Sequence, residues 1–244
     1  MKCHQRKIRD NLMAAKPRPV HTSMDGYEVE PIDYKDAAYI ILQFEWLKSM
    51  PTAGLAFYGL WDADDDLIGA VCFGRGSGSN AANLCGEQYR ASAICLERGA
   101  CAYWAHPHAA SFLISRACKQ AHKDHGWKIF YGYSDHEAGE IGTIYQACNW
   151  YYLGVGAGRP AKSYRFVYIT PDGAEHSSRW WRGYAKREGI EWSDAEQSGW
   201  TRRKQYDKAR YVWFEGGKIE KRRLRKALRY PVQDYPKRKT EIET

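Results

Sequence analysis

Residue types that acid–base chemistry uses gather in one short stretch of this sequence, YSDHEAGEIGTIYQACNWYYLG at residues 133–154. Asp135 follows a run of β-forming residues, so we expect its carboxylate at a strand end, where α/β folds commonly place functional groups. There it can hold or deprotonate an amine, or it can cap the following turn. Tyr145 lies ten residues further on. Its hydroxyl suits a general acid, and its ring equally suits a core position.

Asn149 and Trp150 follow closely after Tyr145. An asparagine amide can pair with the edge of an adenine in a bidentate way, but it can also end a helix as a cap. We interpret Trp150 as a core residue and leave both roles open for Asn149. The stretch therefore predicts a catalytic edge, with an acid at a strand tip and a tyrosine and an amide on the helix above it.

Apolar spacing and turn residues predict the elements that must position these side chains. Their order is β-α-β-β-β-α-β-α-β, which indicates a mixed α/β sheet and resembles the GNAT acyltransferase fold. The predicted strands cover residues 27–34, 54–61, 67–76, 93–105, 127–134 and 150–156, and the predicted helices cover residues 36–50, 107–126 and 139–149.

Composition divides the chain into three predicted parts. Residues 1–24 read as a basic, extended N-terminal arm, and residues 25–158 as the GNAT-like catalytic core. Residues 159–244 read as a basic, aromatic-rich appendage packed on the core, because no flexible linker precedes them. Within it we expect a hairpin at PDG, basic helical stretches near 180–188 and 194–208, a strand at ARYVWFEGG and a final basic segment.

Charge is distributed very unevenly. Residues 19–158 carry nine bases and sixteen acids, whereas residues 159–244 carry twenty-two bases and twelve acids. The bases are interleaved with Trp and Tyr, a mixture that suits phosphate contacts and base stacking. We therefore expect the appendage to bind nucleic acid. The candidate DNA-binding residues are Arg202, Arg203, Lys204, Arg222, Arg223, Arg225 and Lys226.

Seven cysteines, an odd number without a C-x-x-C pair, argue against a disulfide framework and a thiolate zinc site. No run reaches the roughly 18 apolar residues of a membrane span, and the N-terminus lacks the apolar segment of a signal peptide. These features predict a cytoplasmic protein with no membrane partner.

Three longer motifs carry a resemblance to a known family. They are CLERGACAYWAHPHAASFLISRA, the stretch quoted above with its GTIYQACNW string, and KARYVWF followed by LRKALRYPVQDYPKR. Together they resemble the phage Mom family, which modifies adenines in phage DNA, protects that DNA from restriction and is proposed to have a GNAT-like fold. The resemblance covers residues 55–158 well and residues 159–240 more loosely.

The resemblance implies functional roles for Arg98, Ser111, Asp135 and Tyr145. It implies a transferase whose product is an adenine with a methylcarbamoyl group on its exocyclic amine. This chain has Glu45-Trp46 where family members often have His-Tyr, and His108 where they often have Asn. We therefore expect Glu45 to act at the catalytic site, and His108 and Tyr58 to contact substrate.

The sequence and the resemblance identify the cofactor less directly than they identify the site residues. In GNAT folds the helix N-terminus near Ser111 would bind the pyrophosphate of acyl-CoA, so an acyl-CoA-like donor is one candidate. The usual glycine loop is absent, however, and attaching a methylcarbamoyl group is an alkylation. A divalent metal is a second candidate, with Glu45, His108 and His136 as ligands.

The predicted partners are double-stranded DNA and a small-molecule donor, with a homodimer as one candidate assembly. An N-acyltransferase acting on a small amine, a protein or a modified nucleotide is the alternative function. A non-catalytic DNA-binding protein is the second alternative.

Overall fold

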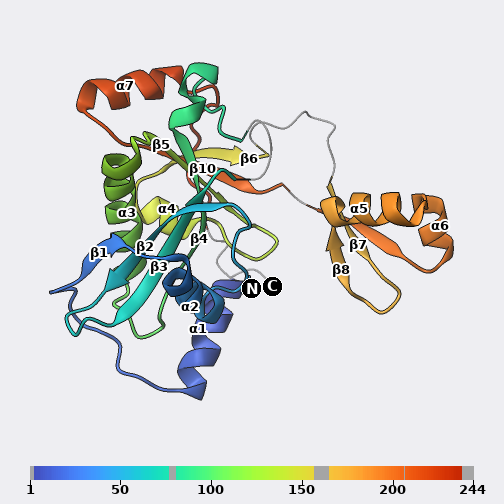
Figure 1. Cartoon of the computed structure of the whole chain (residues 1–244), viewed down its shortest axis with the longest axis horizontal. Helices are drawn as coiled ribbons and strands as arrows, with labels where there is room; N and C mark the ends of the chain where they lie inside the picture. The colour runs from blue at the N-terminus through green and yellow to red at the C-terminus, as the bar shows by residue number, and fades with distance from the viewer. Residues whose placement is uncertain (1–2, 77–80, 157–164, 206, 238–244) are drawn as a thin grey trace. The chain divides into compact units, whose positions relative to one another are not determined.

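The computed structural model describes residues 3–76, 81–156, 165–205 and 207–237, which form two compact units (Figure 1). The larger unit, here the core unit, comprises residues 1–158 and 208–244. The smaller unit comprises residues 159–207.

A seven-stranded sheet in the order β1-β2-β3-β4-β5-β10-β6 forms the core unit. Only the β4–β5 pair is parallel, and the other pairs of neighbours are antiparallel. This arrangement confirms the predicted mixed α/β sheet. The strands are β1 (Glu28–Pro31), β2 (Gly54–Trp61), β3 (Leu67–Gly74), β4 (Ala93–Cys101), β5 (Ile129–Ser134), β6 (Tyr151–Val155) and β10 (Ala209–Phe214).

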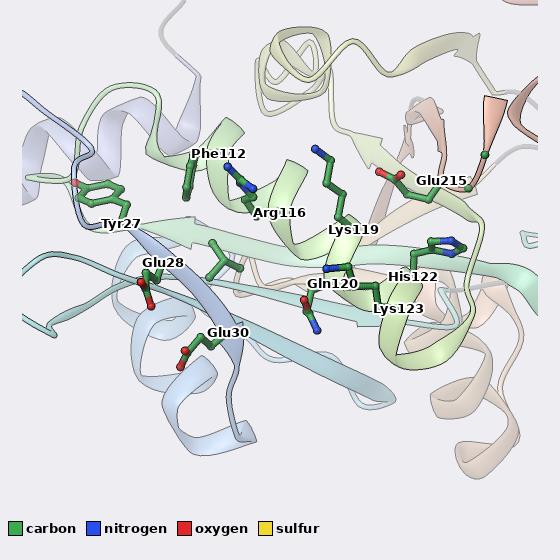
Figure 2. Close-up of a pocket in the computed structure, with 13 residues that line it drawn as sticks. Tyr27, Glu28, Glu30, Phe112, Arg116, Lys119, Gln120, His122, Lys123 and Glu215 are labelled. Atoms are coloured by element: carbon green, nitrogen blue, oxygen red, sulfur yellow. The ribbon is translucent and has the colours of Figure 1, made fainter.

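Helices cover both faces of this sheet. α2 (Tyr34–Phe44) begins at Asp33, whose side chain accepts a hydrogen bond from the backbone N–H of Asp36. α3 (Ala109–His125) ends at Gly126, which adopts the left-handed conformation that favours glycine. Figure 2 shows α3 on one side of the strands and α2 on the other. A short helix, α4 (Thr143–Ala147), and a 3-10 turn at Glu87–Ser92 complete this part of the chain.

The N-terminal segment is helical where an extended arm was expected. α1 (His4–Ala15) is held at its start, where the backbone N–H of His4 donates to the carbonyl of Ala138. The Gln5 side chain donates to the carbonyl of Phe44 and accepts from the backbone N–H of Trp46. These contacts fix a polar helix that its own composition would not have stabilised.

The C-terminal region also differs from the expected single appendage. β10 lies between β5 and β6 inside the core sheet. It carries buried apolar side chains on both faces, as a strand in the middle of a covered sheet requires. α7 (Lys218–Ala227) buries Leu224 against Val212 and Phe214 of that strand. Residues 208–237 therefore pack as part of the core unit.

The smaller unit has its own sheet and its own aromatic core. Its strands, in the order β8-β7-β9, are β7 (Arg165–Ile169), β8 (Glu175–Ser177) and β9 (Thr201–Gln205). β7 and β8 form the hairpin expected at PDG. The smaller unit also contains the helices α5 (Ser178–Glu188) and α6 (Trp192–Gln197). The rings of Tyr168 on β7 and Trp181 on α5 stack with their centroids 4.8 Å apart. The helix expected near 194–208 ends at Gln197, because Gly199 turns the chain into β9, which pairs with β7.

The cysteines are free, as the sequence predicted, and all but Cys101 are buried. Among the helices of the described ranges, none is both long enough and apolar enough to cross a lipid bilayer.

A fork between two parallel strands as the candidate active site

The parallel strands β4 and β5 stop pairing before either strand ends. Their register runs from Ala93 opposite Ile129 to Leu96 opposite Gly132. Beyond that point β4 continues against β3, and β5 continues against β10. An irregularity in the β3–β4 register leaves Glu97 as an extra residue at the same point. Such bulges often lie beside active sites, where they re-aim side chains. We call residues 97–101 of β4 and residues 133–134 of β5 the fork.

Glu45 brings a buried carboxylate to the fork from the C-terminal end of α2. The residue is 8% exposed, and its Oε2 lies 3.4 Å from Nε of Arg98 on β4. Burial raises the pKa of the Glu45 carboxyl to about 7, although Arg98 and the backbone N–H of Gly99 act to lower it. Glu45 is therefore a group that can bind or release a proton near neutral pH.

Arg98 ties the end of α2 to the fork. Its Nε donates to the carbonyl of Ser49 at 2.9 Å, and its Nη1 donates to the carbonyl of Glu97 at 2.7 Å. These bonds fix the guanidinium beside Glu45. The structure thus brings together Arg98 and Glu45, two of the residues that the sequence predicted for the catalytic site.

Tyr145 reaches the fork from α4. Its ring stacks on Tyr211 at 5.1 Å and lies 4.9 Å from Trp150. The hydroxyl lies directly over Gly132, since a Cβ at that position would be 2.5 Å from it. Burial raises the pKa of Tyr145, and Cys95 and Glu45 add to the rise. The hydroxyl is protonated at neutral pH, and burial makes it a weaker acid than the hydroxyl of an ordinary tyrosine. The ring of Tyr145 is therefore a core residue, which is one of the two roles expected from the sequence, and its hydroxyl lies beside the fork.

Asp135 follows β5 directly and pairs with Lys208, whose Nζ is 3.2 Å from Oδ2. Its Oδ1 also accepts a hydrogen bond from the backbone N–H of Glu137, which is the capping arrangement expected as the alternative. Lys208 acts electrostatically on Glu45 as well. Asp135 therefore lies at the same end of the sheet as Glu45, and the ammonium group of Lys208 interacts electrostatically with both carboxyl groups.

Ser111 lies in the first turn of α3, where its Oγ donates to the carbonyl of His108. Its own carbonyl accepts a contact from the thiol of Cys148 at 3.6 Å, which joins α3 to the segment after α4. His108 is the exposed N-cap residue of α3. Within the described ranges, no three His, Cys, Asp or Glu side chains gather as a metal site requires. The expected set of Glu45, His108 and His136 is thus not assembled as a ligand cluster there.

Two other predicted residues serve the fold. The hydroxyl of Tyr58 donates to Asp124 of α3 at 2.8 Å, and its ring is buried in the core. Asn149 is exposed and adopts a positive φ of 58°, so it forms the turn that ends α4. Trp150 is buried, as its interpretation as a core residue required.

Residues that the sequence did not single out also reach the fork. Glu97 accepts a hydrogen bond from Gly76 through Oε1, but its buried Oε2 lacks a hydrogen-bond partner in the described ranges. The same is true of Oγ of Ser134 and of Nε and Nη1 of Arg210. Buried polar atoms usually have partners, so these atoms, on the adjacent strands β4, β5 and β10, are candidates for contact with a ligand. The sequence feature that could have identified Glu97 and Arg210 is a charged residue within a strand whose other residues are mostly apolar.

The predicted DNA-binding residues lie on two elements. Arg222, Arg223, Arg225 and Lys226 are exposed on α7 of the core unit. Arg202, Arg203 and Lys204 are exposed on β9 of the smaller unit, where Arg202 also lies over the Trp192 ring at 4.5 Å. α7 and β9 thus belong to different units.

A groove of about 670 Å³ runs along α3, outside the fork. Tyr27 and Phe112 line one end, and Glu215 and His122 the other (Figure 2). The bases Arg116, Lys119 and Lys123 come from α3, and Glu28 and Glu30 from β1. None of the side chains described at the fork lines this groove.

Comparison with known proteins relates the sequence to one protein family. The model of the Mom protein family matches residues 26–237. No curated protein matches the chain in sequence. Solved structures similar to this one include a spermidine N-acetyltransferase from Vibrio cholerae, with 11% identity over 78% of this chain and 96% of that chain and a TM-score of 0.41. A GNAT family acetyltransferase from Elizabethkingia anophelis shares 11% identity over 78% of this chain and 99% of that chain, with a TM-score of 0.40.

Proposed function

The chain belongs to the Mom protein family, and from this we propose that it is a transferase that modifies DNA. In the proposed reaction a methylcarbamoyl-like group is added to the exocyclic amine of adenine. The observation that carries the proposal is the buried Glu45 carboxyl, whose pKa burial raises to about 7 at the fork. An exocyclic amine is a weak nucleophile, so a base poised near neutral pH supports its reaction.

The proposed step is a substitution at carbon. The amine nitrogen forms a bond to the CH₂ carbon of a donor X–CH₂–CO–NH₂, and the bond from that carbon to the leaving group X breaks with its electron pair. Glu45 takes the proton that the amine loses, and Tyr145 donates a proton to X. The donor in this scheme is a small activated acetamide, so the step itself is an alkylation.

The remaining side chains have supporting roles in this proposal. Arg98 holds Glu45 in place and moderates its pKa. Asp135 and Lys208 form the charged wall beside the fork. Because the fork lies inside a folded sheet, the target base must leave the duplex to reach it. α7 and β9 supply the exposed bases proposed to hold the DNA backbone.

Nucleoside mass spectrometry of DNA from cells that express the protein tests the proposal. We expect a new adenosine species with the mass of the added group in cells with the unchanged chain, and none with Glu45→Gln. DNA without any modified nucleoside in cells with the folded, unchanged protein would contradict it. Consumption of acetyl-CoA with a small amine as acceptor would then favour the alternative N-acyltransferase.

A further inference from the structure

Arg210 of β10 is a buried cation, and two of its three guanidinium nitrogens lack hydrogen-bond partners in the described ranges. Its side chain is 8% exposed, and Nε and Nη1 are closed to solvent. In the part of the chain that the structure describes, neither atom has a hydrogen-bond partner, and no carboxylate lies within ion-pair distance of the guanidinium. The rings of Tyr133 and Tyr230 flank it at 5.3 and 5.4 Å.

This arrangement differs sharply from that of Arg98. Arg98 has a carboxylate beside it and donates to the carbonyls of Ser49 and Glu97. Two aromatic faces supply Arg210 with only part of what water or an anion would supply. A guanidinium buried without a counter-charge is destabilising, so Arg210 is costly to the fold unless a ligand completes its contacts.

Arg210 lies beside the fork. It is directly opposite Tyr133, in the part of β5 that no longer pairs with β4. Glu97 of β4 and Arg210 act electrostatically on the same two groups, Cys95 and Tyr131. Burial raises the pKa values of Cys95 and Tyr131, Glu97 adds to each rise, and Arg210 opposes each. Oε2 of Glu97 and Nε and Nη1 of Arg210 lack hydrogen-bond partners in the described ranges, and the two side chains form no ion pair with each other there.

We propose that Arg210 is the receptor for an oxyanion that the reaction brings to the fork. Its planar N–H groups can hold two oxygens of a carboxylate or a phosphate at once. The proposed function offers two sources of that oxyanion, and the identification of these sources rests on the proposed function. One is a phosphate of the target nucleotide, and the other is a carboxylate on the leaving group X of the small-molecule donor.

Thermal unfolding of the purified full chain tests the receptor without relying on activity. The unchanged protein is melted in sodium chloride, in sodium phosphate and in sodium acetate at equal ionic strength. We expect one of the two anions to raise Tm by about 2–4 °C when it is present at several times its dissociation constant. Phosphate as the effective anion identifies the nucleotide as the source, and acetate identifies the donor.

Arg210→Met and Arg229→Met provide the matched pair of variants. Arg210→Met should raise Tm in chloride and abolish the anion-dependent rise, because it removes an unpaired buried charge and the receptor together. Arg229→Met, which removes an exposed arginine that follows α7, should change neither value. Arg210→Lys keeps the charge without the planar group, and we expect it to retain less than half of the rise.

Three results would overturn the receptor. They are an equal anion-dependent rise in Arg210→Met, no rise with either anion in the unchanged protein, and a lower Tm of both Arg210 variants in chloride. The last result would make Arg210 a clamp between Tyr133 and Tyr230. Each can occur whether or not cellular DNA is modified, so failure of the receptor is distinguishable from failure of the proposed function.

Discussion

The hydroxyl of Tyr145 is one oxygen atom on a ring that the core already needs. The ring packs against Tyr211 and Trp150, whereas no described residue forms a hydrogen bond with the hydroxyl. Tyr145→Phe should therefore change the free energy of unfolding by less than about 0.5 kcal/mol. It should lower the rate of DNA modification roughly 100-fold or more, if the hydroxyl is the general acid.

Tyr211→Phe is the matched control for Tyr145→Phe. The Tyr211 hydroxyl donates to the carbonyl of Ile141 and accepts from Gln146. Its loss should cost about 1 kcal/mol of stability with a small effect on rate. Denaturant unfolding and single-turnover kinetics measure both quantities. Unchanged turnover in Tyr145→Phe would leave the residue with its packing role alone.

Glu45 predicts a specific dependence of stability on pH. Its pKa is about 7 in the folded protein against an ordinary value of 4.5, so the folded state binds the extra proton between these values. Stability should therefore fall as pH rises from about 5 to 7 and should level off above that. The loss is roughly 3 kcal/mol by linkage.

Glu45→Gln removes the titrating group and should flatten that pH dependence. Denaturant unfolding of both proteins at pH 5 and pH 8 gives the comparison. Parallel pH profiles for the two proteins would mean that the carboxyl titrates in its ordinary range and is not poised for proton transfer.

The sequence showed part of the candidate site because some residues carry their chemistry in recognisable local patterns. Asp135 and Tyr145 belong to one short segment, and the fold brings both to the fork. Arg210 and Glu97 were missed, because each lies in a strand whose burial depends on partners distant in sequence. An arginine within the otherwise apolar ARYVWF was the clue, since strands buried on both faces rarely carry a charge.

At the scale of elements, the strands and helices of residues 25–158 could be predicted from apolar spacing and turn residues. The end of β4–β5 pairing could not, because register depends on which strands become neighbours. β10 was expected in an appendage for the same reason. α1 was expected to be extended because its sequence is polar, and its contacts with Phe44, Trp46 and Ala138 are what hold it.

α7 offers the clearest test of DNA binding by an element of the core unit. Arg222, Arg223 and Lys226 are exposed, whereas Arg225 also packs on the Tyr151 ring at 4.2 Å. Replacing the first three with Ala should make the log–log salt dependence of duplex binding shallower by about 0.9 per lost phosphate contact. Affinity should fall about equally for all sequences, because phosphate contacts position rather than specify.

An equal charge loss on α3 is the control for α7. Arg116, Lys119 and Lys123 line the groove along that helix, and replacing them with Ala removes the same charge from another surface. Fluorescence anisotropy across a salt series compares the two triple variants. A shallower slope for the α3 variant alone would assign the DNA contact to the groove.

At the scale of the whole molecule, the smaller unit is an insertion between two adjacent strands. β6 and β10 are antiparallel neighbours, with Val155 opposite Ala209, so the two ends of the insertion meet at one place in the core sheet. Replacing residues 157–207 with a short Gly/Ser turn should leave a cooperatively folding core unit.

The shortened chain should bind duplex DNA more weakly, because it loses the exposed bases of β9. Thermal unfolding and the same anisotropy assay measure both effects. An unfolded product would mean that the core unit depends on the smaller one, and unchanged affinity would leave α7 as the better supported DNA contact.

The place of β10 also sets an order of events during synthesis. β5 and β6 emerge early from the ribosome, but the strand that fills the space between them ends only at Phe214. Until then both strands present unpaired edges, which invite pairing with other chains. Arg210 arrives with that last strand, so the fork gains its buried cation as the sheet closes. A nascent chain released before residue 214 should therefore aggregate, whereas the finished chain carries its own closing strand.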